Sequence, residues 1–123
     1  MAFMTKYSTG DIVSVEFPFS DLQYRKRRPG LVLFGDDDDL VLARVTTHPA
    51  RNPSDMTLAY WAQSGLPRAS TIRLAKLATV DRRLVHHKIG RLHPEDARLV
   101  MEVWQTLALF MSEEFQKKRT PSA

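Results

Sequence analysis

Four consecutive cations, Arg25, Lys26, Arg27 and Arg28, run into Pro29 and then into the apolar segment "GLVLF". A guanidinium group stays charged at every physiological pH, and its planar fork of N–H groups fits phosphate oxygens. Held at the entrance to a strand, such a run indicates contact with a polyanion. The residues alone favour a plainer alternative, in which the run is the solvated edge of a charged loop.

Other residue types that carry chemistry are scarce. The chain has no cysteine, which excludes disulfides, thiolate zinc sites and cysteine nucleophiles. Its histidines show no i, i+4 pair of the kind that binds a metal on a helix; they are His48, His86, His87 and His93. We therefore expect no metal and no other cofactor.

Length and composition indicate a single small domain. The 123 residues are 43% hydrophobic, enough for one core, and the net charge of +4 is weak evidence for an acidic partner. We expect one domain over 1–123, with its core over about 10–116 and a flexible tail over 117–123. The chain starts without a signal-peptide pattern, and no apolar stretch approaches the ~18 residues of a membrane span. A cytoplasmic protein without membrane contact is therefore expected.

Short strands separated by turn signals dominate the first three quarters of the chain. Residues 11–17 alternate as a half-buried strand does, and Pro18 ends them. A loop over 18–29 leads to a buried strand at 30–34, and a strand over 40–47 completes a hairpin around the acidic tip "GDDDD". Other predicted strands cover 56–61, 70–74, 76–80 and, more weakly, 84–92, with loops at 48–55 and 62–69.

The last quarter of the chain has helical character. Pro94 suits a first helical position, and Glu95 and Asp96 follow where the helix dipole favours anions. Apolar residues then recur at spacings of three and four over 93–116, as in an amphipathic helix; they are Val100, Val103, Trp104, Leu107, Phe110 and Met111. We predict a fold that is mainly β with α, in which five to seven short strands form a small barrel or coiled sheet and one long helix follows.

Several local patterns also occur in a recognisable order. They are "GDIVSVEFPFSD", "KRRPGLVL", "LARVTT", "SGL-x3-STIRLAKLATVD" and "IGRLHPEDARLV". From Gly10 to about Phe110 this order resembles the PemK/MazF family of toxin endoribonucleases from bacterial type II toxin–antitoxin modules. The resemblance implies a small SH3-like β-barrel, the CcdB/PemK-like toxin fold, with a C-terminal helix.

The same resemblance implies a function. Members of this family form homodimers, cut single-stranded RNA at short sequences without a metal, and are blocked by a cognate antitoxin protein. Their catalytic pair is an arginine before the proline of the "RP" block and a threonine at the end of the next strand, which match Arg28 and Thr46 here. A family serine matches Ser70, which we expect to bind RNA. Relative to the family, the loop before Arg28 is short, and the acidic tip would have to point away from RNA.

RNA cleavage of this kind uses the 2′-OH as nucleophile and leaves a 2′,3′-cyclic phosphate and a 5′-OH. Arg28 would stabilise charge on the phosphate, and Thr46 would bind a phosphate oxygen or orient the 2′-OH. Neither is a suitable base, so we hypothesise that His48 takes the proton. In an extended segment, residues i and i+2 face the same side, which would aim Thr46 and His48 into one site.

Other residues would contact RNA without reacting. Arg25, Lys26 and Arg27 are expected to steer phosphates, and Tyr60 and Trp61 to stack on unpaired bases. Each has a structural alternative. The cations would belong to an exposed loop, the two aromatic rings would pack in a core or dimer interface, and the Ser70 hydroxyl would satisfy backbone groups.

Two other functions remain open on the sequence. One is a non-catalytic toxin or binding protein that resembles the gyrase inhibitors of related fold and acts through its C-terminal helix, or that binds RNA without cutting it. The other is a structural or regulatory barrel domain. A role for Arg28 together with Thr46 distinguishes the nuclease from both.

Overall fold

Six antiparallel strands and one long helix make up the computed structural model, which describes residues 6–16 and 26–119. The predicted class, mainly β with a C-terminal helix, is confirmed. A 3-10 turn at Arg82–Leu84 joins the last two strands. The main elements are β1 (Asp11–Glu16), β2 (Arg27–Gly35), β3 (Asp39–Thr46), β4 (Asp55–Thr57), β5 (Thr71–Asp81), β6 (Val85–Arg91) and α1 (Pro94–Arg119).

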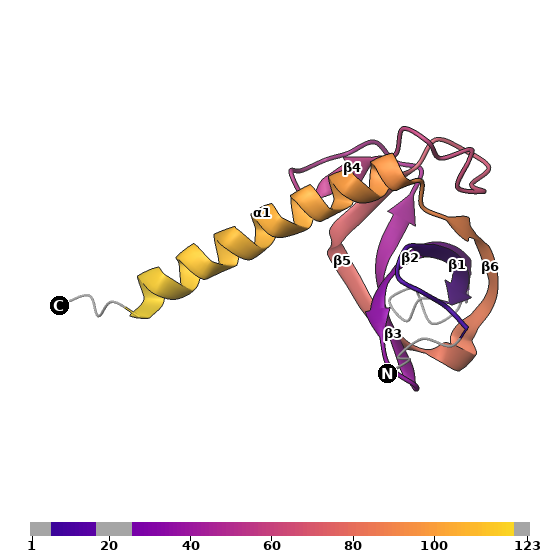
Figure 1. Cartoon of the computed structure of the whole chain (residues 1–123), viewed down its shortest axis with the longest axis horizontal. Coiled ribbons are helices and arrows are strands. Elements are labelled where there is room, and N and C mark those ends of the chain that lie inside the picture. Colours follow the sequence, from indigo (N-terminus) through magenta and orange to yellow (C-terminus); the bar gives the residue numbers. More distant parts are fainter. Residues whose placement is uncertain (1–5, 17–25, 120–123) are drawn as a thin grey trace.

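The strands form one sheet in the order β4-β5-β3-β2-β1-β6, and the sheet curls strongly on itself (Figure 1). In the described part of the chain, no ladder joins the edge strands β4 and β6. Instead, the loop after β4 packs against the β6 backbone. A Cβ atom added at Gly90 would collide with the carbonyl oxygen of Ser64, and one at Gly65 (φ +89°) would lie 2.7 Å from that of Ile89. Close backbone packing through two glycines thus bridges the sheet edges.

Strand β2 begins earlier than predicted. Arg27, Arg28 and Pro29 were expected in a loop, but they belong to the strand, where Pro29 lies opposite Ser14 of β1. The ladder between β2 and β3 begins only at Gly30, so the missing N–H of Pro29 costs no bond to β3. The cations that precede the proline are therefore placed by the sheet.

Strand β4 is shorter than predicted. It ends at Thr57, whereas Tyr60 lies in a bend and Trp61 begins the turn that follows. The cause is Asp96 of α1, a fully buried carboxylate that accepts the backbone N–H groups of Ala59 (3.0 Å) and Tyr60 (2.9 Å). These bonds draw the chain away from the sheet and tie it to the start of the helix.

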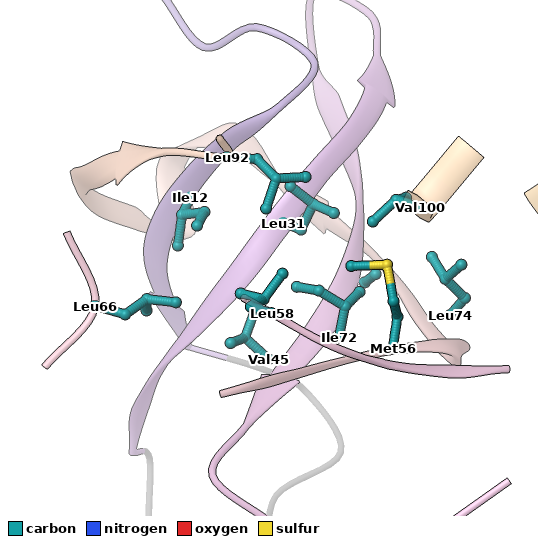
Figure 2. Close-up of a cluster of buried hydrophobic side chains, with 11 residues drawn as sticks. Ile12, Leu31, Val45, Met56, Leu58, Leu66, Ile72, Leu74, Leu92 and Val100 are labelled. Atoms are coloured by element: carbon teal, nitrogen blue, oxygen red, sulfur yellow. The ribbon is translucent and has the colours of Figure 1, made fainter. Parts of the chain in front are cut away.

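Apolar side chains gather on both faces of the sheet. One cluster, shown in Figure 2, lies under the loop after β4 and the first turns of α1; it comprises Ile12, Leu31, Ala43, Val45, Met56, Leu58, Leu66, Ile72, Leu74, Leu92 and Val100. The second cluster comprises Tyr7, Val13, Val15, Val32, Leu40, Leu42, Ala78 and Val80. Burial on both faces explains why β2 and β3 read as continuous apolar runs.

Only the first half of α1 packs against the sheet. Val103, Trp104 and Leu107 lie on the first cluster, as their helical spacing predicted. The helix then extends away from the sheet (Figure 1), runs through Arg119 and exposes Leu109, Phe110, Met111 and Phe115. Among the described residues, no helix has both the length and the apolar content needed to cross a membrane.

Candidate active site

One face of β3 changes from apolar to polar along its length. Leu40, Leu42, Arg44 and Thr46 alternate with their neighbours and so share this face. The first two belong to the second apolar cluster, whereas Arg44 and Thr46 lie beyond it. The polar end of the face is the candidate site, and the second apolar cluster continues the same face toward the start of β3.

Arg28 lies on the same face and at the same end of the sheet as Thr46. Gly30 of β2 pairs with Arg44 of β3, and Arg28 and Thr46 each lie two residues beyond that pair. Side chains two residues apart point to the same side, so both belong to the face that carries Arg44. Arg28 is also opposite Val15, a member of the second cluster. The Arg28 and Thr46 side chains are both half-buried, so each is accessible to solvent and also packs against the protein.

The Thr46 hydroxyl is oriented by the chain that follows it. Its Oγ1 accepts the backbone N–H of His48 at 3.2 Å, which leaves its O–H proton available to a ligand. Strand β3 ends at Thr46, however, and His48 lies in an exposed bend. The extended geometry from which we placed the His48 side chain beside Thr46 is therefore wrong.

Four guanidinium groups gather around this site. Burial and then the neighbouring charges of Arg28, Arg73 and Arg51 lower the pKa of Arg44. Arg73 lies opposite Arg44 across the β3–β5 ladder, on the same face. A buried carboxylate, Asp55, accepts from Arg73 Nε at 3.2 Å and from the backbone N–H of Arg51 at 2.9 Å.

The sequence had not pointed to Arg44, Arg51, Arg73 or Asp55. Arg44 stands two residues before Thr46, a spacing that marks the same strand face and that we had not used. Arg73 and Asp55 had no comparable signal, because their place depends on how β5 pairs with its neighbours.

The described cations of the opening run differ in exposure, since Arg28 is half-buried and its two predecessors are exposed. Lys26 and Arg27 are exposed at the start of β2, where phosphate steering stays a prediction. Arg25 lies outside the described residues. The acidic tip forms the predicted hairpin turn, in which Asp36 Oδ1 accepts the N–H groups of Asp38 and Asp39. This turn is at the opposite end of β2 and β3 from Arg28, so its charge points away from the site.

The other three residues predicted to contact RNA, Ser70, Tyr60 and Trp61, make contacts within the protein. The Ser70 hydroxyl is buried and donates to the carbonyl oxygen of Arg68 at 2.8 Å. Trp61 packs on the first apolar cluster, and the ring of Tyr60 stacks on that of His93 with centroids 3.9 Å apart. The contacts of Ser70 and Trp61 match their structural alternatives, whereas Tyr60 belongs to neither apolar cluster, and the RNA contacts of all three stay predictions. Across the described residues, no three His, Asp or Glu side chains are grouped as a metal site would require.

Several solved structures have the same fold. An endoribonuclease from a mycobacterial species, solved in complex with its cognate antitoxin, matches with a TM-score of 0.67 at 16% identity, over 82% of this chain and 93% of that one. The Mycobacterium tuberculosis toxin MazF-mt6 matches with a TM-score of 0.62 at 18% identity, over 76% and 90%. MazF from Deinococcus radiodurans matches with a TM-score of 0.64 at 18% identity, over 83% and 96%.

A comparison with models of protein families identifies the family of this chain. No curated protein matches the sequence. A family model does match, over residues 8–110, and it describes the PemK-like, MazF-like toxin of type II toxin–antitoxin systems. Because that model covers most of the chain, this protein belongs to the PemK-like, MazF-like toxin family.

Proposed function

We propose that this toxin is a metal-independent endoribonuclease that cuts single-stranded RNA. The observation that carries the proposal is that Arg28 and Thr46 lie on one face and at one end of the neighbouring strands β2 and β3. A guanidinium and a hydroxyl can there address the same phosphodiester. In the proposed step, the 2′-oxygen bonds to phosphorus, the bond to the 5′-oxygen breaks, and a proton passes from the 2′-OH to a base while another reaches the 5′-oxygen.

Arg28 and Thr46 have distinct roles in this step. The Arg28 fork binds the non-bridging phosphate oxygens, where negative charge grows in the transition state. The Thr46 oxygen accepts the His48 N–H, which leaves its O–H proton free to donate to a phosphate oxygen. Fixed donors of this kind cost no reorganisation during the reaction, and loss of one typically costs about 10²–10³ in rate.

The base is proposed to be His48. Its backbone N–H donates to the Thr46 hydroxyl. The His48 backbone is therefore next to the proposed catalytic pair, although its segment is not extended. We expect His48→Ala to remove the acidic limb of the pH–rate profile while Thr46→Val leaves its shape unchanged. An unchanged profile in His48→Ala would assign the proton to water or to another group.

We also propose that the protein acts in the cytoplasm, as a homodimer, and that a cognate antitoxin inhibits it. A relative of the same fold was solved with its cognate antitoxin. The distal half of α1 offers apolar surface for protein contact, because Phe110 is 57% exposed and Phe115 is 70% exposed. A toxin that acts only through such contacts, without cutting RNA, is the alternative function.

The deciding experiment is cleavage of long single-stranded RNA in EDTA by the purified chain, with mapping of the ends. We expect 2′,3′-cyclic phosphate and 5′-OH ends from the wild type, and a loss of about 10²-fold or more in Arg28→Gln and Thr46→Val. Arg98→Gln is the matched control, since it removes the same charge from an exposed helix position that pairs with Glu95 and Glu102. RNA that is bound but left intact by the wild type would favour the non-catalytic function.

A further inference from the structure

Arg44 is a second cation on the face that carries the proposed catalytic pair. It lies one strand repeat inward from Thr46, or about 7 Å along β3. It is half-buried, with the apolar Leu42 on one side and Thr46 on the other. The position opposite Arg44 on β2 is Gly30, which has no side chain to cover it.

One side-chain donor of Arg44 is left open by the part of the chain that the structure describes. Its Nε is buried and has no hydrogen-bond partner among the described residues. The neighbouring carboxylate, Asp55, is committed to Arg73 Nε and to the Arg51 backbone. Arg44 is therefore a partly buried cation with a donor left open.

The charge around Arg44 is also unbalanced. Three further guanidiniums, those of Arg28, Arg51 and Arg73, lie near enough to disfavour its charged form, and burial disfavours it further. An unpaired cation in such surroundings costs folding free energy. A bound anion beside the half-buried guanidinium would offset this unbalanced charge, so the arrangement is suited to an anionic ligand.

We infer that Arg44, with Arg73 held behind it by Asp55, is a subsite for the RNA phosphate next to the scissile one. This inference rests on the proposed nuclease function. Arg28 and Thr46 then hold the phosphate that reacts, and Arg44 holds its neighbour one strand repeat along β3. The second contact fixes the direction of the backbone through the site, which in-line attack by the 2′-OH requires. Arg44 is a substrate-binding residue and Asp55 is a positioning residue.

The first test needs no RNA. Thermal unfolding is compared in phosphate and in chloride at equal ionic strength for the wild type, Arg44→Met and the control Arg98→Met. Binding to the native state raises Tm with phosphate concentration. We expect Arg44→Met to lose at least half of this phosphate-dependent rise, and to be at least as stable as the wild type in chloride. An equal phosphate response in Arg44→Met and in the wild type would overturn the subsite.

The second test identifies the phosphate. In a short RNA that contains a mapped cut site, the phosphate next to the scissile one is replaced by an uncharged methylphosphonate on either side in turn. We expect one replacement to lower the wild-type kcat/KM about tenfold or more, as loss of a charged hydrogen bond does. The same replacement should have no further effect in Arg44→Met, whereas in Arg98→Met it should act as in the wild type.

The outcomes separate the two proposals. If the wild type cuts no RNA, the nuclease function fails, and the phosphate-dependent Tm still decides whether Arg44 binds an anion. A second outcome is that RNA is cut and the methylphosphonate lowers kcat/KM of Arg44→Met by the same factor as that of the wild type. In that case Arg44 does not contact the neighbouring phosphate. Arg44→Met that weakens only antitoxin binding, with unchanged RNA kinetics, would likewise overturn the subsite and assign the cluster to acidic side chains of the antitoxin.

Discussion

Replacing Asp55 by asparagine tests how the arginine cluster is held together. The Asp55 side chain is 1% exposed and that of Arg73 is 13% exposed, so the pair is largely withdrawn from water. The substitution removes the negative charge but keeps the shape and one acceptor oxygen. It leaves Arg73 without a countercharge beside Arg44 and Arg51, whose charges already repel one another.

The expected cost follows from this burial. Breaking a buried ion pair by removing one partner costs about 3–5 kcal/mol. Arg73 keeps some exposure and the asparagine oxygen can still accept one hydrogen bond, so the lower end, about 3 kcal/mol, applies here. With an unfolding entropy of about 2.1 cal/mol/K per residue, the 123 residues correspond to about 0.26 kcal/mol/K. We therefore expect Tm to fall by about 12 °C.

Thermal and urea unfolding of four proteins measures this effect. They are the wild type, Asp55→Asn, Arg73→Met and the double variant. Because the asparagine does its damage by leaving Arg73 unpaired, Arg73→Met should recover most of the lost stability in the double variant. Asp81→Asn is the matched control, since Asp81 pairs with Arg83 on the surface at 2.8 Å and its loss should leave Tm nearly unchanged.

Two results would refute this reasoning. A fall in Tm as small as that of the Asp81→Asn control would mean that water already screens the Arg73 charge. An equal loss in Asp55→Asn and in the double variant would mean that Asp55 acts through the Arg51 backbone N–H alone, and not through the arginine cluster.

Two further substitutions, at Asp96 and Asp11, test how the helix and β1 are anchored. Asp96→Ala leaves the N–H groups of Ala59 and Tyr60 without their acceptor, so we expect the free energy of unfolding in urea to fall by about 2–4 kcal/mol, with an unchanged m-value. Burial raises the pKa of Asp11, but hydrogen bonds from Ser8, Lys88 and Arg91 outweigh burial, and the net pKa lies below its ordinary value. The stabilisation by the Asp11 carboxylate is therefore complete above about pH 4 and lost as the pH falls through the native pKa, and acid unfolding of Asp11→Asn should show a weaker pH dependence there.

Alternation and helical spacing predicted most elements of this fold. The strands at β1 and β3, the hairpin around the acidic tip and the long helix follow from residues close together in the sequence. The predicted limits of β2 and β4 were wrong because they depend on distant partners. Pro29 continues a strand since Ser14 lies opposite it, and the strand before Tyr60 ends early since Asp96, 36 residues later, binds its N–H. Nothing within either segment carries that information.

Strand β5 illustrates the same limit within the candidate site. We predicted two strands, and the structure has one, Thr71–Asp81, with an irregularity opposite Ala43 and Arg44. Ala43 pairs with Leu77, but Arg44 pairs with Arg73, so three residues of β5 are passed over between successive partners. Because three is an odd number, the even-numbered residues of β5 lie on opposite faces of the sheet before and after this point, and so do the odd-numbered ones.

That exchange places the arginine cluster. Beyond the irregularity, Ala78 and Val80 lie on the second apolar cluster; before it, Thr71 and Arg73 occupy the same face. Had the register continued without it, Ile72 would face the candidate site and Arg73 would enter the first apolar cluster, which has no acceptor for a guanidinium among its members. The irregularity thus lets one continuous strand contribute Val80 to the second apolar cluster and Arg73 to the charge beside Arg44. A sequence pattern with a period of two contains the placement of Arg44 on the face of Thr46 but not this change of parity in β5, which is why Arg73 could not be placed beside Arg44 from the sequence.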